Sequence, residues 1–285
     1  MTQPQSISAA RRRRLLALRP SLDALYIRYN QRHFVDPDPL APLYGFPDPR
    51  DQEIAGLIAA ALAFGHVRQI LRSIEIVLQA LPSPAANLPS LSDAALRRRL
   101  DGFRHRYITG VEVVSLLAAI RQVLREHDRI GACFATGDDP AVPTLVPGLT
   151  RFVDCLRVHG GLEKNYLLPD PARGSACKRW FMYLRWMVRE DAVDLGHWRG
   201  LGAHRLVVPV DTHMHRVARG LGLTRRKSAD LKTALEITRA FSVICPEDPV
   251  RYDFCLTRLG IRADGDMPGF LREVAATRGQ AHEPQ

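Results

Sequence analysis

Apolar residues recur along most of the chain at the spacing of three and four residues that places them on one face of a helix. Segments that alternate polar and apolar residues, as half-buried strands do, are nearly absent. Residues 50–64 are apolar almost all round, which predicts a buried central helix. Further helices are expected over residues 21–30, 66–81, 111–124, 147–157, 175–189 and 248–260, and from residue 212 onward.

Three polar residues stand where helices are expected to begin. Ser175 and Asp248 precede apolar-periodic segments, and Pro249 occupies a first helical position. Asp211 follows the apolar run 207–210 and can accept hydrogen bonds from the amides of the next helix. We therefore expect all three side chains to cap helices.

The segmentation predicts an all-α protein with two helical lobes around the central buried helix. Residues 1–20 are expected to form a basic, flexible N-terminal arm that contains the run Arg11–Arg14. A single helical domain in two lobes is expected over residues 21–275, followed by a disordered tail over 276–285. We expect the polar, glycine-containing segment 189–205 to loop out from this domain.

Overall composition is that of an ordinary globular protein, with 46% hydrophobic and 25% charged residues. The charge balance is less ordinary, because 40 Lys and Arg residues against 30 Asp and Glu give a net charge of +10. Such an excess favours a polyanionic partner through long-range attraction and the release of counterions. Nucleic acid is the partner class that this balance favours.

The cysteines suggest no metal centre. The five of them are scattered and contain no C-x-x-C pair, so neither a zinc site nor an iron–sulfur cluster is expected. Reduced thiols fit a cytoplasmic protein, and no apolar run approaches the roughly 18 residues of a membrane span. We expect a cytoplasmic, monomeric protein with no cofactor, no bound metal and no membrane contact.

The stretch V-V-P-V-D-T-H-M-H-R at 207–216 allows two interpretations. In the first, Asp211, His213 and His215 form a D-x-H-x-H metal site, as in a metal-dependent hydrolase. In the second, Asp211 caps a helix, and the two histidines then diverge by about 200° around its axis. The segments after Asp211 read as helices rather than as the alternating strands of a hydrolase barrel, which favours the second interpretation.

The residues V-P-V-D-T-H-M-H-R-V-A at 208–218 also resemble a segment of the helix-hairpin-helix DNA glycosylases. This superfamily includes endonuclease III and the 8-oxoguanine glycosylases, and its catalytic aspartate falls on Asp211. Over its whole length the chain resembles an uncharacterised bacterial family of the same superfamily. The resemblance implies a glycosylase-like fold, in which the hairpin at 168–175 is degenerate because it contains one glycine.

In the bifunctional members of that superfamily a catalytic lysine begins the preceding helix, and the resemblance places it at Lys178 within 173–179. An amine attacks carbon only when it is neutral, and the ordinary pKa of lysine is about 10.4. The positive end of a helix and burial beside Trp180 and Phe181 would both lower this pKa. The alternative is that Lys178 contacts a phosphate at the helix N-terminus.

These features predict a DNA repair glycosylase that flips a damaged base out of duplex DNA, with possible AP-lyase activity. The resemblance suggests an oxidised purine as the substrate. If Lys178 is not the nucleophile, Asp211 is expected to orient a water. Two alternatives stay open: a non-catalytic nucleic-acid-binding protein on the same scaffold, and, more remotely, the metal-dependent hydrolase.

Candidate DNA contacts lie in two segments. Phe64 or His66, between two expected helices, is a candidate wedge for the space that a flipped base leaves, with Arg68 as a phosphate contact. The alternative is that Phe64 belongs to the core and His66 to an exposed loop. Ser175 and Arg179, beside Lys178, are candidate phosphate contacts at the start of their helix.

Overall fold

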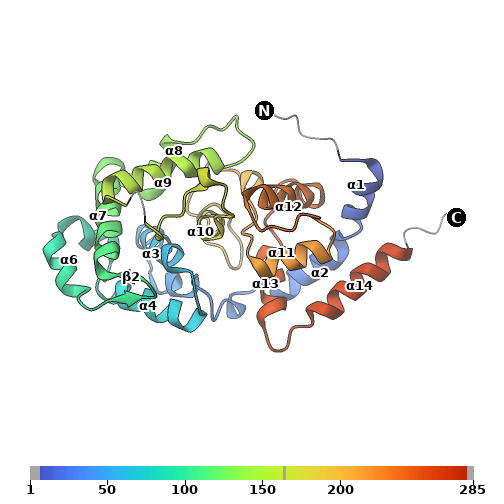
Figure 1. The fold of residues 1–285 in the computed structure, drawn as a ribbon, viewed down its shortest axis with the longest axis horizontal. Coiled ribbons are helices and arrows are strands. Elements are labelled where there is room, and N and C mark those ends of the chain that lie inside the picture. The colour runs from blue at the N-terminus through green and yellow to red at the C-terminus, as the bar shows by residue number, and fades with distance from the viewer. Residues whose placement is uncertain (1–6, 163–164, 281–285) are drawn as a thin grey trace.

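A computed structural model describes residues 7–162 and 165–280, and these fold mostly as helices (Figure 1). The expectation of an all-α protein is confirmed. Within the described residues the strands are β1 (Arg104–His105) and β2 (Ile108–Thr109), which pair in an antiparallel hairpin. None of the helices in these residues is long and apolar enough to cross a membrane.

One group consists of helices that are consecutive in the sequence, from α3 to α9, and it lies on the left of Figure 1. In it α3 packs on α4 and α5, and α7 packs on α6, α8 and α9. The members of this group are α3 (Pro49–Leu62), α4 (Val67–Gln79), α5 (Pro84–Asn87), α6 (Asp93–Arg99), α7 (Gly110–His127), α8 (Ile130–Thr136) and α9 (Val146–Gly160).

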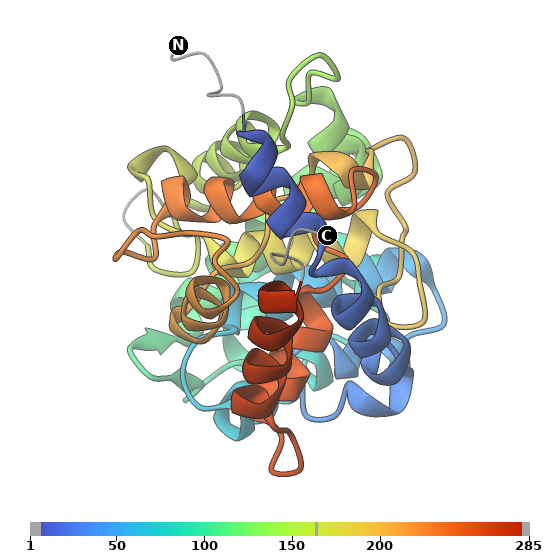
Figure 2. The same cartoon turned by 90° about the vertical axis from the view of Figure 1, so that its right-hand side faces the viewer.

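The second group contains helices from the beginning and from the end of the sequence, since α1 packs on α12 and α2 packs on α13. Figure 2 faces this side of the molecule, where α1, α2 and α14 lie in front. The helix predicted to be central, at 50–64, belongs to the first group as α3. The members of this group are α1 (Ala9–Leu16), α2 (Arg19–Tyr29), α11 (Thr212–Gly220), α12 (Leu231–Ile244), α13 (Asp253–Ile261) and α14 (Met267–Gln280).

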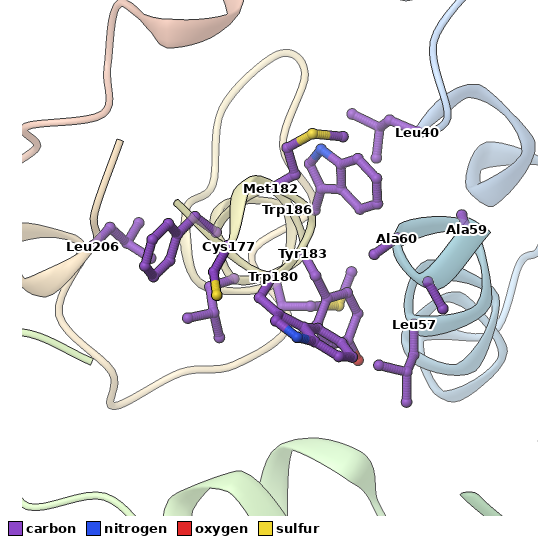
Figure 3. Close-up of a cluster of buried hydrophobic side chains, with 14 of the residues drawn as sticks. Leu40, Leu57, Ala59, Ala60, Cys177, Trp180, Met182, Tyr183, Trp186 and Leu206 are labelled. Atoms are coloured by element: carbon purple, nitrogen blue, oxygen red, sulfur yellow. The ribbon is translucent and has the colours of Figure 1, made fainter. Parts of the chain in front are cut away.

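The helix between the two groups is α10 (Lys178–Val188). Its Trp180, Tyr183 and Trp186 are buried, and Figure 3 shows their side chains beside Leu57 and Ala60 of α3. Helix α3 is buried from Ile54 to Leu62, as its apolar sequence predicts. The core therefore centres on the α3–α10 contact, which fixes the direction of α10 and the place where it begins.

The flexible arm predicted for residues 1–20 was wrong from residue 9 onward. Helix α1 buries Leu15, Leu18 is buried beyond its end, and Arg11 donates a hydrogen bond to the carbonyl oxygen of Leu223 at 3.1 Å. Leucines on one face of the basic segment dock it on the second group. The tail predicted for 276–285 was wrong over 276–280, where α14 continues; residues 1–6 and 281–285 lie outside the described residues.

Two of the predicted helix caps were wrong. Helix α10 begins at Lys178, preceded by Cys177 in a left-handed conformation, so Ser175 lies too far upstream to cap it. Its hydroxyl contacts the Cys177 thiol at 3.1 Å instead. Helix α13 begins at Asp253 rather than near Asp248, and the Asp248 carboxylate binds Arg189 at 2.6 Å.

The segment 189–205 does not loop out. Its amides at Leu195 and Gly196 donate to the Trp186 carbonyl oxygen, at 3.0 and 3.1 Å. Asp194 is buried between Arg185 and Arg189. The last carbonyl groups of a helix have no partner within the helix, and this segment supplies donors for them. It therefore closes the far end of α10.

Candidate active site

Lys178 and Asp211 meet where two helices begin. Lys178 is the first residue of α10, and Asp211 is the residue before α11. The Lys178 Nζ donates a hydrogen bond to Asp211 Oδ2 at 2.7 Å, although 33 positions separate the two residues. The expectation that they lie together is confirmed, while their catalytic role stays a prediction.

The position of Asp211 is fixed by its role as a helix cap. The preceding residues Val208 and Val210 are buried, and the Val208 amide donates to the Thr238 hydroxyl at 3.0 Å. Oδ1 of Asp211 accepts a hydrogen bond from the Met214 amide at 2.8 Å, as a capping residue does. The predicted cap is confirmed, and the cap leaves Oδ2 facing Lys178.

The carboxyl group of Asp211 is held in its ionised form. Burial acts to raise its pKa, but the charge of Lys178 and the hydrogen bonds from Lys178 and the Met214 amide outweigh burial. The pKa of Asp211 therefore lies below its ordinary value of 3.8. At neutral pH this site pairs a carboxylate with a primary amine group.

A cavity of about 540 Å³ opens beside the pair. The side chains of Lys178 and Asp211 are 36% and 34% exposed, so both reach solvent through it. Ligand sites of a few hundred cubic ångströms accommodate small organic molecules. Its walls include Phe64, Gly65, Met182, His213, Phe254 and Arg258.

Sequence reasoning missed Asp253, a buried carboxyl group in the wall of this cavity. Burial raises the pKa of Asp253 to about 6, although its ion pair with Arg185 and the charge of Lys178 act in the opposite direction. Asp253 lies in the interior of a segment predicted to be one helix, and no motif marked it. Only the packing of α13 on α11 and the ion pair with Arg185 of α10 bring it to the site.

The histidines of the D-x-H-x-H pattern point to different surroundings. His215 is buried, and its Nε2 lies 3.0 Å from the Arg226 carbonyl oxygen, whereas His213 lines the cavity. The residues that the structure describes contain no group of three or more His, Cys, Asp or Glu side chains that could hold a metal ion. This geometry does not favour the hydrolase interpretation.

Arg179 is not placed to contact a phosphate, in contrast to the prediction. Its side chain is buried, and its guanidinium donates to the carbonyl oxygens of Ala61 and Tyr166. Neighbouring residues on a helix point about 100° apart, so Arg179 faces the interior while Lys178 faces the cavity. Its role is to join the loop before α10 to the end of α3.

The other candidate DNA contacts lie at or near the surface. His66 and Arg68 are exposed at the start of α4, and Phe64 is partly buried in the cavity wall. Ser175 is exposed in the turn before α10, close to Asp230. Nothing in these positions tests a contact with DNA, so these assignments stay predictions.

A larger hollow of about 830 Å³ lies elsewhere, lined by Glu53, Arg129, His197 and Trp198 among others. Its buried carboxylate, Glu53, is already bound by Arg129 and by the Gly131 amide. Because the Glu53 carboxylate already has partners on both oxygens, this hollow offers a weaker case for chemistry than the Lys178–Asp211 cavity.

Comparison with protein families gives one finding. Residues 38–262 match the family described as "Protein of unknown function (DUF2400)". The chain belongs to this family. Lys178, Asp211 and Asp253 all lie within the matched residues, whereas α1, α2 and α14 lie outside them. Comparison with curated proteins and with solved structures gave no match.

Proposed function

We propose that this protein is a DNA glycosylase that removes a damaged base from duplex DNA, with an associated AP-lyase activity. The observation that carries the proposal is the 2.7 Å contact between Lys178 Nζ and Asp211 Oδ2 at the wall of a cavity. The resemblance of residues 208–218 to the helix-hairpin-helix glycosylases supports the same assignment.

Lys178 is the nucleophile of the first step. Asp211 Oδ2 accepts the proton that the amine loses, and the free electron pair of Nζ forms a bond to C1′ of the sugar. The bond between C1′ and the base nitrogen breaks, and the base leaves with that electron pair and gains a proton from solvent. Asp211 passes the proton it accepted on to solvent, and the restored carboxylate stabilises the positive charge that develops on the sugar as the base leaves.

Strand cleavage follows from the same attachment. The nitrogen now bound to C1′ carries a positive charge and loses one proton, which restores its electron pair. The bond between C1′ and the ring oxygen then breaks, that oxygen takes a proton, and the nitrogen pair forms a protonated imine to C1′. Loss of a proton from C2′ then forms the C2′–C3′ double bond as the 3′ phosphate leaves with the electron pair of its bond. Water hydrolyses the imine and releases Lys178.

The charge and the shape of the protein fit a DNA substrate. Its net charge of +10 favours attraction to phosphates. A base must leave the helical stack before a side chain can reach C1′, and a cavity of about 540 Å³ can accommodate a flipped base. An oxidised purine is the substrate that the sequence resemblance favours.

Incubation with a panel of damaged duplexes, followed by borohydride, tests the proposal. Borohydride reduces an imine to a stable amine, so a lyase becomes covalently joined to its DNA. We expect base release and a covalent adduct with the wild-type protein, and loss of both in Lys178→Ala. Lys232→Ala is the matched control, because Lys232 is exposed on α12 and the adduct should persist.

Each other outcome counts against the proposal in a defined way. Base release without an adduct would show that Asp211 activates water and that lyase activity is absent. DNA binding without base release on any duplex, unchanged in Lys178→Ala and Asp211→Ala, would identify a binding protein on a glycosylase-like scaffold.

A further inference from the structure

Three aromatic rings from separate parts of the chain form a cluster beside the cavity. Phe64 comes from the turn between α3 and α4, Tyr107 from the β1–β2 hairpin, and Tyr166 from the loop before α10. Phe64 and Tyr107 are stacked with ring centroids 5.6 Å apart, and Tyr166 meets each of them edge-on at 4.9 Å. Phe64 also lines the cavity that holds Lys178 and Asp211, so the cluster adjoins the candidate active site.

Arg179, which is buried, contacts this cluster from the interior of the protein. Its guanidinium lies 4.9 Å from the ring centroids of both Phe64 and Tyr166, within cation–π distance. The same group donates to backbone carbonyl oxygens on both sides, as described above. His105 packs edge-on against Phe64 at 4.6 Å, and its Nε2 lies 3.0 Å from the Phe64 carbonyl oxygen. The rings are therefore fixed before any ligand arrives.

The outer part of the cluster is open to solvent. Tyr107 and Tyr166 are 50% and 53% exposed, which is unusual for large aromatic residues that have neighbours to pack against. Burial of its hydroxyl and a hydrogen bond with Tyr166 raise the pKa of Tyr107 to about 12. A phenol with the ordinary pKa of about 10 is already neutral at physiological pH, and so is Tyr107, which therefore does not repel a phosphate backbone.

Exposed cationic side chains lie in or next to the elements that carry the rings. Arg106 directly precedes Tyr107 in the hairpin, Arg104 lies two residues before it, and Arg68 lies on α4 after the turn that carries Phe64; all three are exposed. Arg106 also reaches across to the turn that carries Phe64, where its side chain lies close to Gly65. Aromatic rings beside arginines are the combination with which proteins bind unpaired nucleic acid, through stacking on bases and attraction to phosphates.

We propose that Phe64, Tyr107 and Tyr166 form a stacking platform for an unpaired nucleobase at the rim of the cavity. This inference deepens the proposed function and rests on it for the choice of nucleic acid as the ligand. The platform binds the flat face of a base by stacking, so it does not distinguish one base from another. The platform lies beside Lys178 and Asp211. It therefore stabilises DNA in which one base has already left the helical stack near the candidate active site.

A fluorescent base tests the platform without any chemistry at Lys178. The probe is an undamaged single-stranded oligonucleotide that carries one 2-aminopurine, whose fluorescence is quenched when it stacks on an aromatic ring. With the full-length protein we expect binding accompanied by quenching. In Tyr107→Ala/Tyr166→Ala we expect affinity to fall about tenfold, which corresponds to about 1.4 kcal/mol, and the quenching to be lost.

Two control variants separate stacking from other effects. Tyr107→Phe/Tyr166→Phe keeps both rings and should bind and quench as the wild type does. Ile27→Ala removes an exposed apolar side chain from α2, on the other side of the molecule, and should have no effect. Circular dichroism of each variant checks that the helices are retained, and a double-alanine variant that unfolds is replaced by single Tyr107→Ala, which leaves the ring of Tyr166 in place.

The proposal is overturned if the folded alanine variant binds and quenches like the wild type. The exposed rings would then be assigned to contact with another protein instead of with a base. The proposal is equally overturned if the phenylalanine variant loses as much affinity as the alanine variant, because the hydroxyl groups would then carry the binding. The readout is independent of the borohydride adduct. Neither base release nor adduct with intact quenching rejects the glycosylase, and an intact adduct with no quenching rejects the platform.

Discussion

Lys178 and Asp211 are joined through one carboxylate oxygen, because the other oxygen is occupied by the backbone. Oδ2 accepts from the lysine at 2.7 Å, and Oδ1 accepts from the Met214 amide at 2.8 Å. The Asp211 side chain thus caps the start of α11 and also binds the Lys178 amine. A substitution that keeps the acceptor for the Met214 amide but removes the negative charge facing Lys178 can therefore separate the structural role of Asp211 from its chemical role.

Replacement of Asp211 by asparagine should retain the fold and remove the chemistry. Asparagine caps helices about as well as aspartate, so the Met214 amide keeps an acceptor, but the negative charge is lost. We expect the rate of base release to fall by at least about 100-fold, as on loss of a general base. Thermal unfolding should differ little from the wild type, since a partly exposed ion pair contributes about 0–1 kcal/mol.

Asp211→Ala removes the cap as well, and should lower the free energy of unfolding by about 0.5–2 kcal/mol. Ser92→Ala is the control for the loss of a cap alone, because Ser92 caps α6 through the Ala95 amide, and α6 does not line the cavity. That variant should lose stability and keep its activity. Full turnover by Asp211→Asn would show that the carboxylate takes no part in the reaction.

His213 reaches the cavity wall only because residue 260 is a glycine. A Cβ atom at Gly260 would overlap the His213 ring, so Gly260→Ala must displace one or the other. We expect this variant to lose about 1–3 kcal/mol of unfolding free energy, as overpacked sites do. Urea denaturation of Gly260→Ala, His213→Ala and the double variant measures the coupling. If alanine at 260 destabilises the chain equally when His213 is already alanine, the proposed overlap is refuted.

Asp253 should make stability depend on pH in a direction opposite to that of an ordinary ion-paired aspartate. Burial raises its pKa from 3.8 to about 6, so the folded chain binds the proton more tightly than the unfolded chain does. Between about pH 4 and pH 6 the folded state therefore carries more protons, and the contribution of this group to stability falls as pH rises. Asp253→Asn has no such proton to release.

Denaturation at several pH values checks this expectation. The free energy of unfolding of the wild type minus that of Asp253→Asn should fall from pH 4 to pH 6 and stay constant above about pH 7. Asp101→Asn, which changes an exposed carboxyl group before the β-hairpin, is the control and should show no such trend. If the wild type instead gains stability relative to Asp253→Asn over the same range, burial does not dominate at Asp253.

The sequence predicted those parts of the site that depend on local pattern. The cap at Asp211 and the buried helix at 50–64 follow from nearby residues alone, and the motif resemblance added Lys178. Asp253 and Tyr166 were missed because contacts far apart in sequence bring α13 to the cavity and the loop before α10 to Phe64 in the cavity wall. No local spacing encodes such contacts.

The errors have equally specific causes. Ser175 looked like a cap because serine often is one, but Cys177 adopts a left-handed turn that delays the helix by two residues. Arg179 looked like a phosphate contact because it is basic and adjoins Lys178. One position along a helix turns a side chain by about 100°, which is enough to direct it into the core. Burial of a charged residue is decided by tertiary packing, which the sequence pattern does not reveal.

The most direct test of the account locates the covalent bond itself. The protein is trapped on its damaged duplex with borohydride and digested, and the residue that carries the sugar remnant is identified by tandem mass spectrometry. We predict the modification on Lys178, the amine 2.7 Å from Asp211. Modification of a different amine, or base release with no modified residue, would contradict the assignment of Lys178 as the nucleophile.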